Sequence, residues 1–215
     1  MTATAILTLA LGIGVNTALF SYVNGMFLKP HPAIGDPGGL HWVGEVTNDH
    51  GFTNLSGLTY PIFSELRSRP GLFDEITIFR TGSVGLSAAG GEPLELTAEI
   101  VDGGYFSVLR MEMALGRGFL PEEEQKPGTH PVVVLGHDLW QSRFGGSTEV
   151  IGRPVKVNGE WFTVVGVASD GFRGLRDLSE PADLWLPLMM YPVVMRSASS
   201  RAKTPIPTIS PVATQ

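Results

Sequence analysis

The hydrophobic pattern begins with a long segment that carries no charge. Between Thr2 and Leu28 there is no Asp, Glu, Lys or Arg, and every charged side chain lies from Lys29 onward. A helix that spans a membrane needs about 20 mostly apolar residues at roughly 1.5 Å rise per residue. The pattern therefore predicts one N-terminal transmembrane helix over residues 3–28, with the folded body outside the cytoplasm.

The predicted span carries two stripes of small or polar residues at helical spacing. One stripe consists of Thr4, Thr8, Gly12 and Asn16, and the other of Ala10, Gly14 and Ala18. Small residues at this spacing let helix backbones approach closely, and an asparagine within a span needs a hydrogen-bond partner. We therefore expect other transmembrane helices as partners, with a lone anchor that carries these residues by chance as the alternative.

Two other interpretations of this segment have weaker support. A cleaved signal peptide has a basic N-terminal region, an apolar stretch of about 7–15 residues and a small-residue cleavage site, and this sequence lacks all three. Residues 12–18 imitate a glycine-rich phosphate-binding loop. That motif requires a strand before the loop and an acidic residue about 20 positions later, whereas an apolar stretch continues here to Leu28.

Downstream, short apolar and alternating runs predict a turn-rich body over residues 40–192, after a Pro/Gly-rich linker over residues 29–39. Predicted strands cover residues 40–47, 75–79, 83–87, 94–101, 132–135, 154–157, 160–167 and 183–187, and predicted helices cover residues 56–69, 104–109 and 138–144. The pair Asn158-Gly159 is the strongest two-residue signal for a hairpin turn. The fold class is α+β, with a mixed α/β body built mostly from antiparallel hairpins. Residues 193–215 are rich in Ser, Thr and Pro and are predicted to be disordered.

Charge and composition exclude several classes of function. The 215 residues carry a net charge of −6, which argues against nucleic acid as a partner because binding phosphates requires a basic surface. There is no cysteine, which excludes disulfides, Cys-ligated zinc and a thiol nucleophile.

No catalytic, cofactor-binding or metal-binding residues are predicted. The five histidines form no H-x-x-x-H or H-x-H pair, and the run Glu122–Glu124 fits a solvated acidic loop better than a cation site. Neither a G-x-S-x-G elbow nor a G-x-x-x-x-G-K-[ST] phosphate loop occurs, so we expect no ATP hydrolysis by this chain alone. An enzyme would need a pocket that gathers His and carboxylate groups from distant positions.

Seven segments together resemble a known family. They are TLALGIGVNTALF (8–20), VNGMFLKP (23–30), GYFSVL (104–109), LGRGFLP (115–121), VVVLGHDLWQSRFGG (132–146), IGRPVKVNGEWFTVVG (151–166) and DLWLPL (183–188). In this order they resemble the first transmembrane helix and the MacB-like periplasmic core domain of FtsX-like ABC transporter permeases.

The resemblance implies a non-catalytic permease component in the bacterial inner membrane, single-pass as given, with its body in the periplasm. It also implies an ATP-binding cassette ATPase as a partner and, in the macrolide-exporter branch, a periplasmic adaptor protein. Because the family's later spans do not follow residue 188, we expect a fragment of a longer permease. Phe20, Asn24 and Pro30 are expected, from their position alone, to link the span to the body. The alternative function is a single-span anchored extracytoplasmic binding module.

Overall fold

The computed structural model describes residues 10, 12–17, 20, 34–49, 52–87, 93–175, 180–199 and 210–214. The chain divides into two units, Met1–Pro32 and Ala33–Gln215. In the first unit the described residues are helical. Among the residues described, no helix combines the length and the hydrophobicity that crossing a membrane requires. Most of the predicted span over residues 3–28 lies outside the described part of the chain.

Six strands of the second unit close into a ring. In order around the ring they are β4 (Glu75–Ser87), β5 (Leu94–Val101), β10 (Leu184–Pro187), β7 (Val132–Leu135), β9 (Glu160–Ala168) and β8 (Pro154–Val157). The pairs β5–β10 and β7–β9 are parallel, and the other four pairs, including β8 with β4, are antiparallel. The predicted α+β class with antiparallel hairpins is therefore confirmed, and the two parallel pairs make the sheet mixed.

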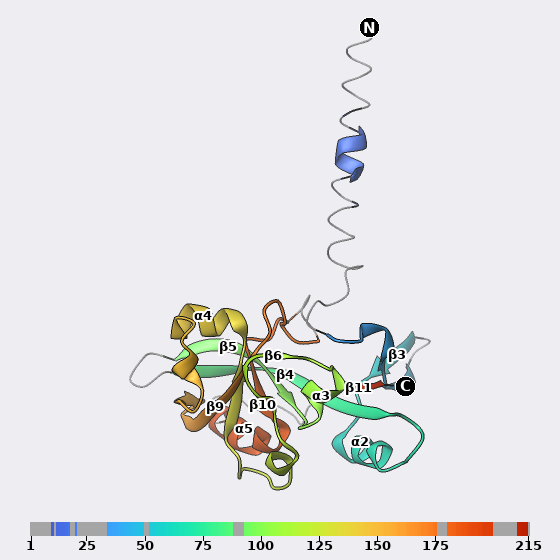
Figure 1. Cartoon of the computed structure of the whole chain (residues 1–215). Helices are drawn as coiled ribbons and strands as arrows, with labels where there is room; N and C mark the ends of the chain where they lie inside the picture. Colours follow the sequence, from blue (N-terminus) through green and yellow to red (C-terminus); the bar gives the residue numbers. More distant parts are fainter. Residues whose placement is uncertain are drawn as a thin grey trace. The chain divides into compact units, whose positions relative to one another are not determined.

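Further strands extend or accompany this ring (Figure 1). β11 (Ser210–Thr214) pairs with both β4 and β1 (Leu40–Trp42), and β6 (Met113–Gly116) pairs with β9. β2 (Glu45–Asp49) and β3 (Phe52–Ser56) form a separate antiparallel hairpin. The helices of this unit are α2 (Tyr60–Arg67), α3 (Tyr105–Val108), α4 (His137–Phe144) and α5 (Tyr191–Ser199), with short 3-10 turns η1 (Pro37–Gly39), η2 (Pro121–Glu124), η3 (Thr148–Val150) and η4 (Leu188–Met190).

Alternation along the strands divides the buried side chains into two cores. On β10, Leu184 and Leu186 belong to the first core, whereas Trp185 between them belongs to the second. This follows from the pleat, which points successive side chains to opposite faces of a sheet. The first core also receives one buried side chain each from α2, α4 and α5, namely Phe63, Leu139 and Val194. The second core lies where α3 covers the other face of the sheet, around Tyr105 and Phe106.

Most predicted elements agree with the structure. The bounds of β5, β7 and β8 are those predicted, and α2, α3, α4, β9 and β10 differ from the prediction only at their ends. The predicted strands 75–79 and 83–87 are one continuous strand, because β5 pairs with β4 on both sides of the polar Arg80–Ser83 stretch. The predicted strand 40–47 is instead two strands, β1 and β2. The sequence patterns did not predict β3, β6, α5 or β11.

The prediction of disorder over residues 193–215 is wrong for two segments. α5 runs to Ser199, and its Val194 has no exposed surface because it packs into the first core. β11 adds to the sheet between β1 and β4. The Ser/Thr/Pro composition concealed both segments, because each needs only a few apolar residues once the rest of the body supplies partners. Residues 200–209 and 215 lie outside the described part.

The hairpin predicted at Asn158-Gly159 is confirmed. Asn158 has φ of 50° and Gly159 has φ of 90°, so both central residues of the turn adopt positive φ. A type I′ turn requires this conformation, which Asn and Gly tolerate better than other residues.

Candidate functional site

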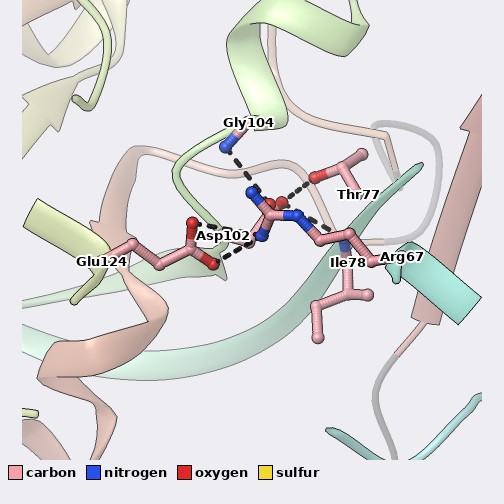
Figure 2. Close-up of polar contacts among 6 residues, drawn as sticks. All are labelled: Arg67, Thr77, Ile78, Asp102, Gly104 and Glu124. Carbon is pink, nitrogen blue, oxygen red and sulfur yellow. Dashed lines mark hydrogen bonds and ion pairs between the residues drawn. The ribbon is translucent and has the colours of Figure 1, made fainter. Parts of the chain in front are cut away.

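A buried carboxylate lies where β5 ends and α3 begins. Asp102 has no exposed surface, and its carboxylate accepts hydrogen bonds from the Thr77 hydroxyl, from the Ile78 amide at 3.3 Å and from the Gly104 amide at 3.2 Å. Thr77 and Ile78 belong to β4, the neighbour of β5 in the sheet. Asp102 therefore fixes the corner at which the chain leaves the sheet (Figure 2).

An arginine from α2 approaches this carboxylate from outside the sheet. Nη1 of Arg67 lies 3.1 and 3.3 Å from the two carboxylate oxygens of Glu124, at the end of η2, and 3.5 Å from Oδ2 of Asp102. The side chain of Arg67 is 48% exposed, whereas that of Glu124 is 10% exposed. Figure 2 shows the guanidinium of Arg67 over the carboxylate of Asp102 and directed toward Glu124. One guanidinium thus joins α2, η2 and the β5–α3 corner, and we call Arg67, Asp102 and Glu124 the ionic junction.

The environment of Asp102 favours its neutral form. Burial raises the pKa of Asp102 from its ordinary value of 3.8 to about 6, and the negative charge of Glu124 acts in the same direction. The hydrogen bonds from Thr77 and Gly104 and the charge of Arg67 oppose this rise. Desolvation is the dominant effect, because a charged carboxylate loses its hydration when it is fully buried.

The ionic junction is suited to holding elements together and not to reacting with a substrate. The carboxylate of Asp102 is sealed, and the cavity of about 200 Å³ beside it is lined by Arg67, Arg69, Phe73 and Ser107 but not by Asp102. An acid–base catalyst must lie within hydrogen-bond reach of the proton that it transfers. Asp102 therefore serves the structure of the body.

A second buried carboxylate lies three residues earlier, on β5 itself. Glu99 accepts hydrogen bonds from the Tyr105 hydroxyl at 2.6 Å, the indole of Trp185 at 2.9 Å and the amide of Leu175 at 3.1 Å. Burial, together with the charge of Glu99, raises the pKa of Tyr105 well above its usual value. A Cβ atom on Gly174, which has φ of 87°, would lie 2.5 Å from a carboxylate oxygen of Glu99. The loop after β9 is therefore fitted closely over this carboxylate.

Three side chains with metal-ligand chemistry meet at the start of α4. The possible ligand atoms of His137, Asp138 and Asp170 lie within 4.8 Å of one another. Among the described residues, this is the one group of three or more such side chains. His137 and Asp138 also line a cavity of about 190 Å³. The sequence pattern does not reveal this grouping, because Asp170 is distant along the chain and no H-x-x-x-H spacing marks it.

The acidic run Glu122–Glu124 is not the solvated loop that the sequence suggested. The side chain of Glu123 is 7% exposed, and its carboxylate accepts two hydrogen bonds from Arg117, at 2.7 and 3.1 Å, and one from the amide of Leu120. Burial opposes ionisation, but these hydrogen bonds prevail and hold the pKa of Glu123 below its usual value. Glu124 belongs to the ionic junction. Two of the three glutamates thus form ion pairs with arginines.

The residues expected to link the span to the body are only partly visible. Phe20 is helical and 67% exposed, whereas Asn24 and Pro30 lie outside the described residues. Their proposed role stays a prediction. The same holds for the expected absence of catalytic, cofactor-binding and metal-binding residues.

Comparison with known proteins relates the chain to one family and one fold. The sequence profile of the family described as MacB-like periplasmic core domain matches residues 2–209. No curated protein sequence matches the chain. The structure is similar to the periplasmic region of MacB from Actinobacillus actinomycetemcomitans, with a TM-score of 0.59 and 17% identity over 87% of this chain and 78% of that one. It is also similar to the extracellular domain of the noncanonic ABC-type transporter YknZ from Gram-positive bacteria, with a TM-score of 0.56 and 17% identity over 75% of each chain.

Proposed function

Since this chain belongs to the family of MacB-like periplasmic core domains of ABC transporter permeases, we propose that it transmits movement between membrane helices and the periplasm without catalysing a reaction. The observation that carries this proposal is the extent of the family match. It runs from residue 2, at the start of the apolar segment, through the folded body to residue 209. A domain that continues directly from a membrane helix is placed to receive displacement of that helix.

The ionic junction supports this role physically. Coupling between distant sites requires an element that both sites can bias, carried by packed side chains and ionic networks. Arg67 joins α2, η2 and the β5–α3 corner through two carboxylates. A displacement of one of these elements therefore exerts a force on the other two. No exposed catalytic constellation is needed for such a function.

The proposal includes the membrane arrangement and the partners. Residues 3–28 span the bacterial inner membrane once, their small-residue stripes pack against other transmembrane helices of a permease, and an ATP-binding cassette ATPase supplies the energy. The expectations of a periplasmic adaptor protein and of a fragment of a longer permease remain predictions beside it.

The membrane arrangement is tested by two reporter fusions and one extraction. Alkaline phosphatase fused after Gln215 should be active, because it folds only outside the cytoplasm. Green fluorescent protein fused at the same position and exported by the same route should not fluoresce. The full chain should stay in the membrane pellet after alkaline carbonate washing. An inactive phosphatase fusion, or a chain released by carbonate, would refute the proposed arrangement.

The alternative of a single-span binding module is favoured by one observation. Tyr60, Ile62 and Leu72, in and just after α2, are large apolar side chains with 38–46% exposure. Exposed apolar surface is a feature of interaction sites. The two functions differ in whether the span packs against other transmembrane helices. Site-specific crosslinks from residues of the span to a second membrane helix support the permease role, and their absence supports the independent module.

A further inference from the structure

A histidine and two aspartates from separate segments converge at the start of α4. His137 and Asp138 are the first two residues of this helix, and Asp170 lies in the turn that follows β9. The imidazole and the two carboxylates each offer a ligand atom, and these atoms lie within 4.8 Å of one another. Imidazole nitrogen and carboxylate oxygen are ligands that zinc and related divalent ions accept.

The distance within one pair of these groups already matches metal coordination. Nδ1 of His137 lies 3.4 Å from Oδ1 of Asp170. Ligand atoms about 2.0–2.1 Å from a tetrahedral ion are separated from each other by roughly 3.3–3.4 Å. We propose that His137, Asp138 and Asp170 form a binding site for a divalent transition-metal ion of the zinc class. A fourth coordination position would remain open to solvent.

The three side chains differ in exposure, and this difference allows them to gather around an ion. The side chain of His137 is 23% exposed, and its ring lies against that of Trp140 in an edge-to-face contact with 5.4 Å between centroids. The side chains of Asp138 and Asp170 are 67% and 82% exposed. One ligand is therefore held by packing, while the other two can turn toward an ion with little loss of packing, although Asp138 must leave its ion pair with Arg173. A bound ion would tie α4 to the β9–β10 connection.

A cationic side chain already lies at this position. Nη2 of Arg173 is 2.5 Å from Oδ2 of Asp138, so the cluster attracts positive charge. The ion must displace this guanidinium from Asp138, and it also meets the positive end of the α4 dipole. Both effects limit the affinity. They also give the proposal a distinctive consequence: removing Arg173 should strengthen metal binding.

Titration of the full chain with Zn²⁺ tests the site. The protein carries no polyhistidine tag, is kept in detergent micelles, and is titrated calorimetrically. We expect one ion per chain, at least tenfold weaker binding in His137→Gln and in Asp170→Asn, and at least threefold tighter binding in Arg173→Met. His130→Gln is the matched control, because His130 lies in an exposed loop and contacts Thr129, and it should bind as the wild type does.

The contact between His137 and Trp140 provides a second measurement. Cu²⁺ quenches nearby tryptophan fluorescence, so the wild type should lose part of its emission on addition of Cu²⁺, and Trp140→Phe should lack that quenched part. Asp170→Asn keeps the test valid if His137→Gln unfolds, because Asp170 is the most exposed of the three. Zn²⁺ affinity unchanged in Asp170→Asn, or not raised in Arg173→Met, would overturn the proposal.

Discussion

The side-chain oxygen of Asn158 accepts a hydrogen bond from the backbone amide of Gly85 at 2.7 Å. The amide of Asn158 in turn donates to the carbonyl of Gly85 at 2.8 Å, and its side-chain nitrogen donates to the carbonyl of Val194 at 3.2 Å. A residue of the β8–β9 turn thus holds β4 and α5 together. These bonds lie beside the β8–β4 pairing that closes the ring of six strands.

Replacing Asn158 by glycine should therefore loosen the closure of the ring. Glycine tolerates φ of 50°, so Asn158→Gly removes the side-chain hydrogen bonds without adding backbone strain. We expect the free energy of unfolding to fall by about 1–2 kcal/mol, measured by denaturant unfolding of the full chain in detergent micelles. Asn158→Asp keeps the acceptor for Gly85 and should lose less; equal losses in the two variants would contradict this account.

Replacing Gly159 by valine tests the turn itself. Gly159 has φ of 90° and no atom within 4 Å of the position of an added Cβ, so the cost of a side chain is conformational and not steric crowding. A β-branched residue at this φ should lower the free energy of unfolding by about 1–3 kcal/mol. Glu160→Val is the matched control, since it places the same side chain on the adjoining strand, where β-branched residues are favoured. Denaturation midpoints that coincide for Gly159→Val and the wild type would exclude the type I′ turn.

The sequence predicts the parts of this structure that depend on neighbouring residues. The Asn158-Gly159 turn and the bounds of β5, β7 and β8 follow from local turn chemistry and alternation. The closed ring does not, because its parallel pair β5–β10 brings Thr97 and Asp183 together from 86 residues apart. Only the complete set of strand partners determines which distant segments pair.

The candidate site was hidden for a related reason. Glu99 falls on the polar face of the alternation with Glu95 and Thr97, and Asp102 directly follows the strand. Alternation alone does not reveal that α3 and the loop after β9 cover the face that carries Glu99. Their arginine, tyrosine and tryptophan partners come from other elements. An acidic residue inside an otherwise apolar strand, as in LELTAEIVD, is the one signal that could have marked the site.

The buried carboxylate of Asp102 should make stability depend on pH. Because burial raises its pKa from 3.8 to about 6, the folded state binds the proton more tightly than the unfolded state does. This contribution to stability is fully present below about pH 4 and is lost as the pH rises through about 6. A shift of this size corresponds to about 3 kcal/mol. The free energy of unfolding of Asp102→Asn, minus that of the wild type, should therefore rise by about this amount between pH 4 and pH 7.5.

Urea unfolding of both proteins at several pH values measures this difference, in which the contributions of the other titrating groups cancel. Thr77→Val provides a second comparison. It removes a hydrogen bond that stabilises the charged form, so it should move the transition to higher pH. A difference between Asp102→Asn and the wild type that stays constant from pH 4 to pH 7.5 would show that Asp102 titrates alike in both states.

The ionic junction should make Arg67 more important than its neighbour Arg69. Arg67→Met leaves the carboxylates of Asp102 and Glu124 without their cation, and removing one partner of a buried pair is destabilising. Because the Arg67 side chain is 48% exposed, solvent screening reduces the expected loss to about 1–2 kcal/mol at pH 7.5. The loss should be smaller at pH 5, where Asp102 is largely protonated and needs no counter-charge.

Arg69→Met is the matched control for this comparison. Arg69 pairs with Glu65 one turn away on the surface, with both side chains more than 60% exposed, so its removal should change the free energy of unfolding by no more than about 0.5 kcal/mol. Denaturant unfolding of the wild type and both variants at pH 7.5 and pH 5 gives the values needed. If Arg67 acts through Asp102, the loss in free energy of unfolding relative to the wild type should differ between the two pH values for Arg67→Met and not for Arg69→Met. Equal losses in the two variants at both pH values would mean that Arg67 is an ordinary surface arginine and that apolar packing, through Phe63 and Leu66, holds α2 to the sheet.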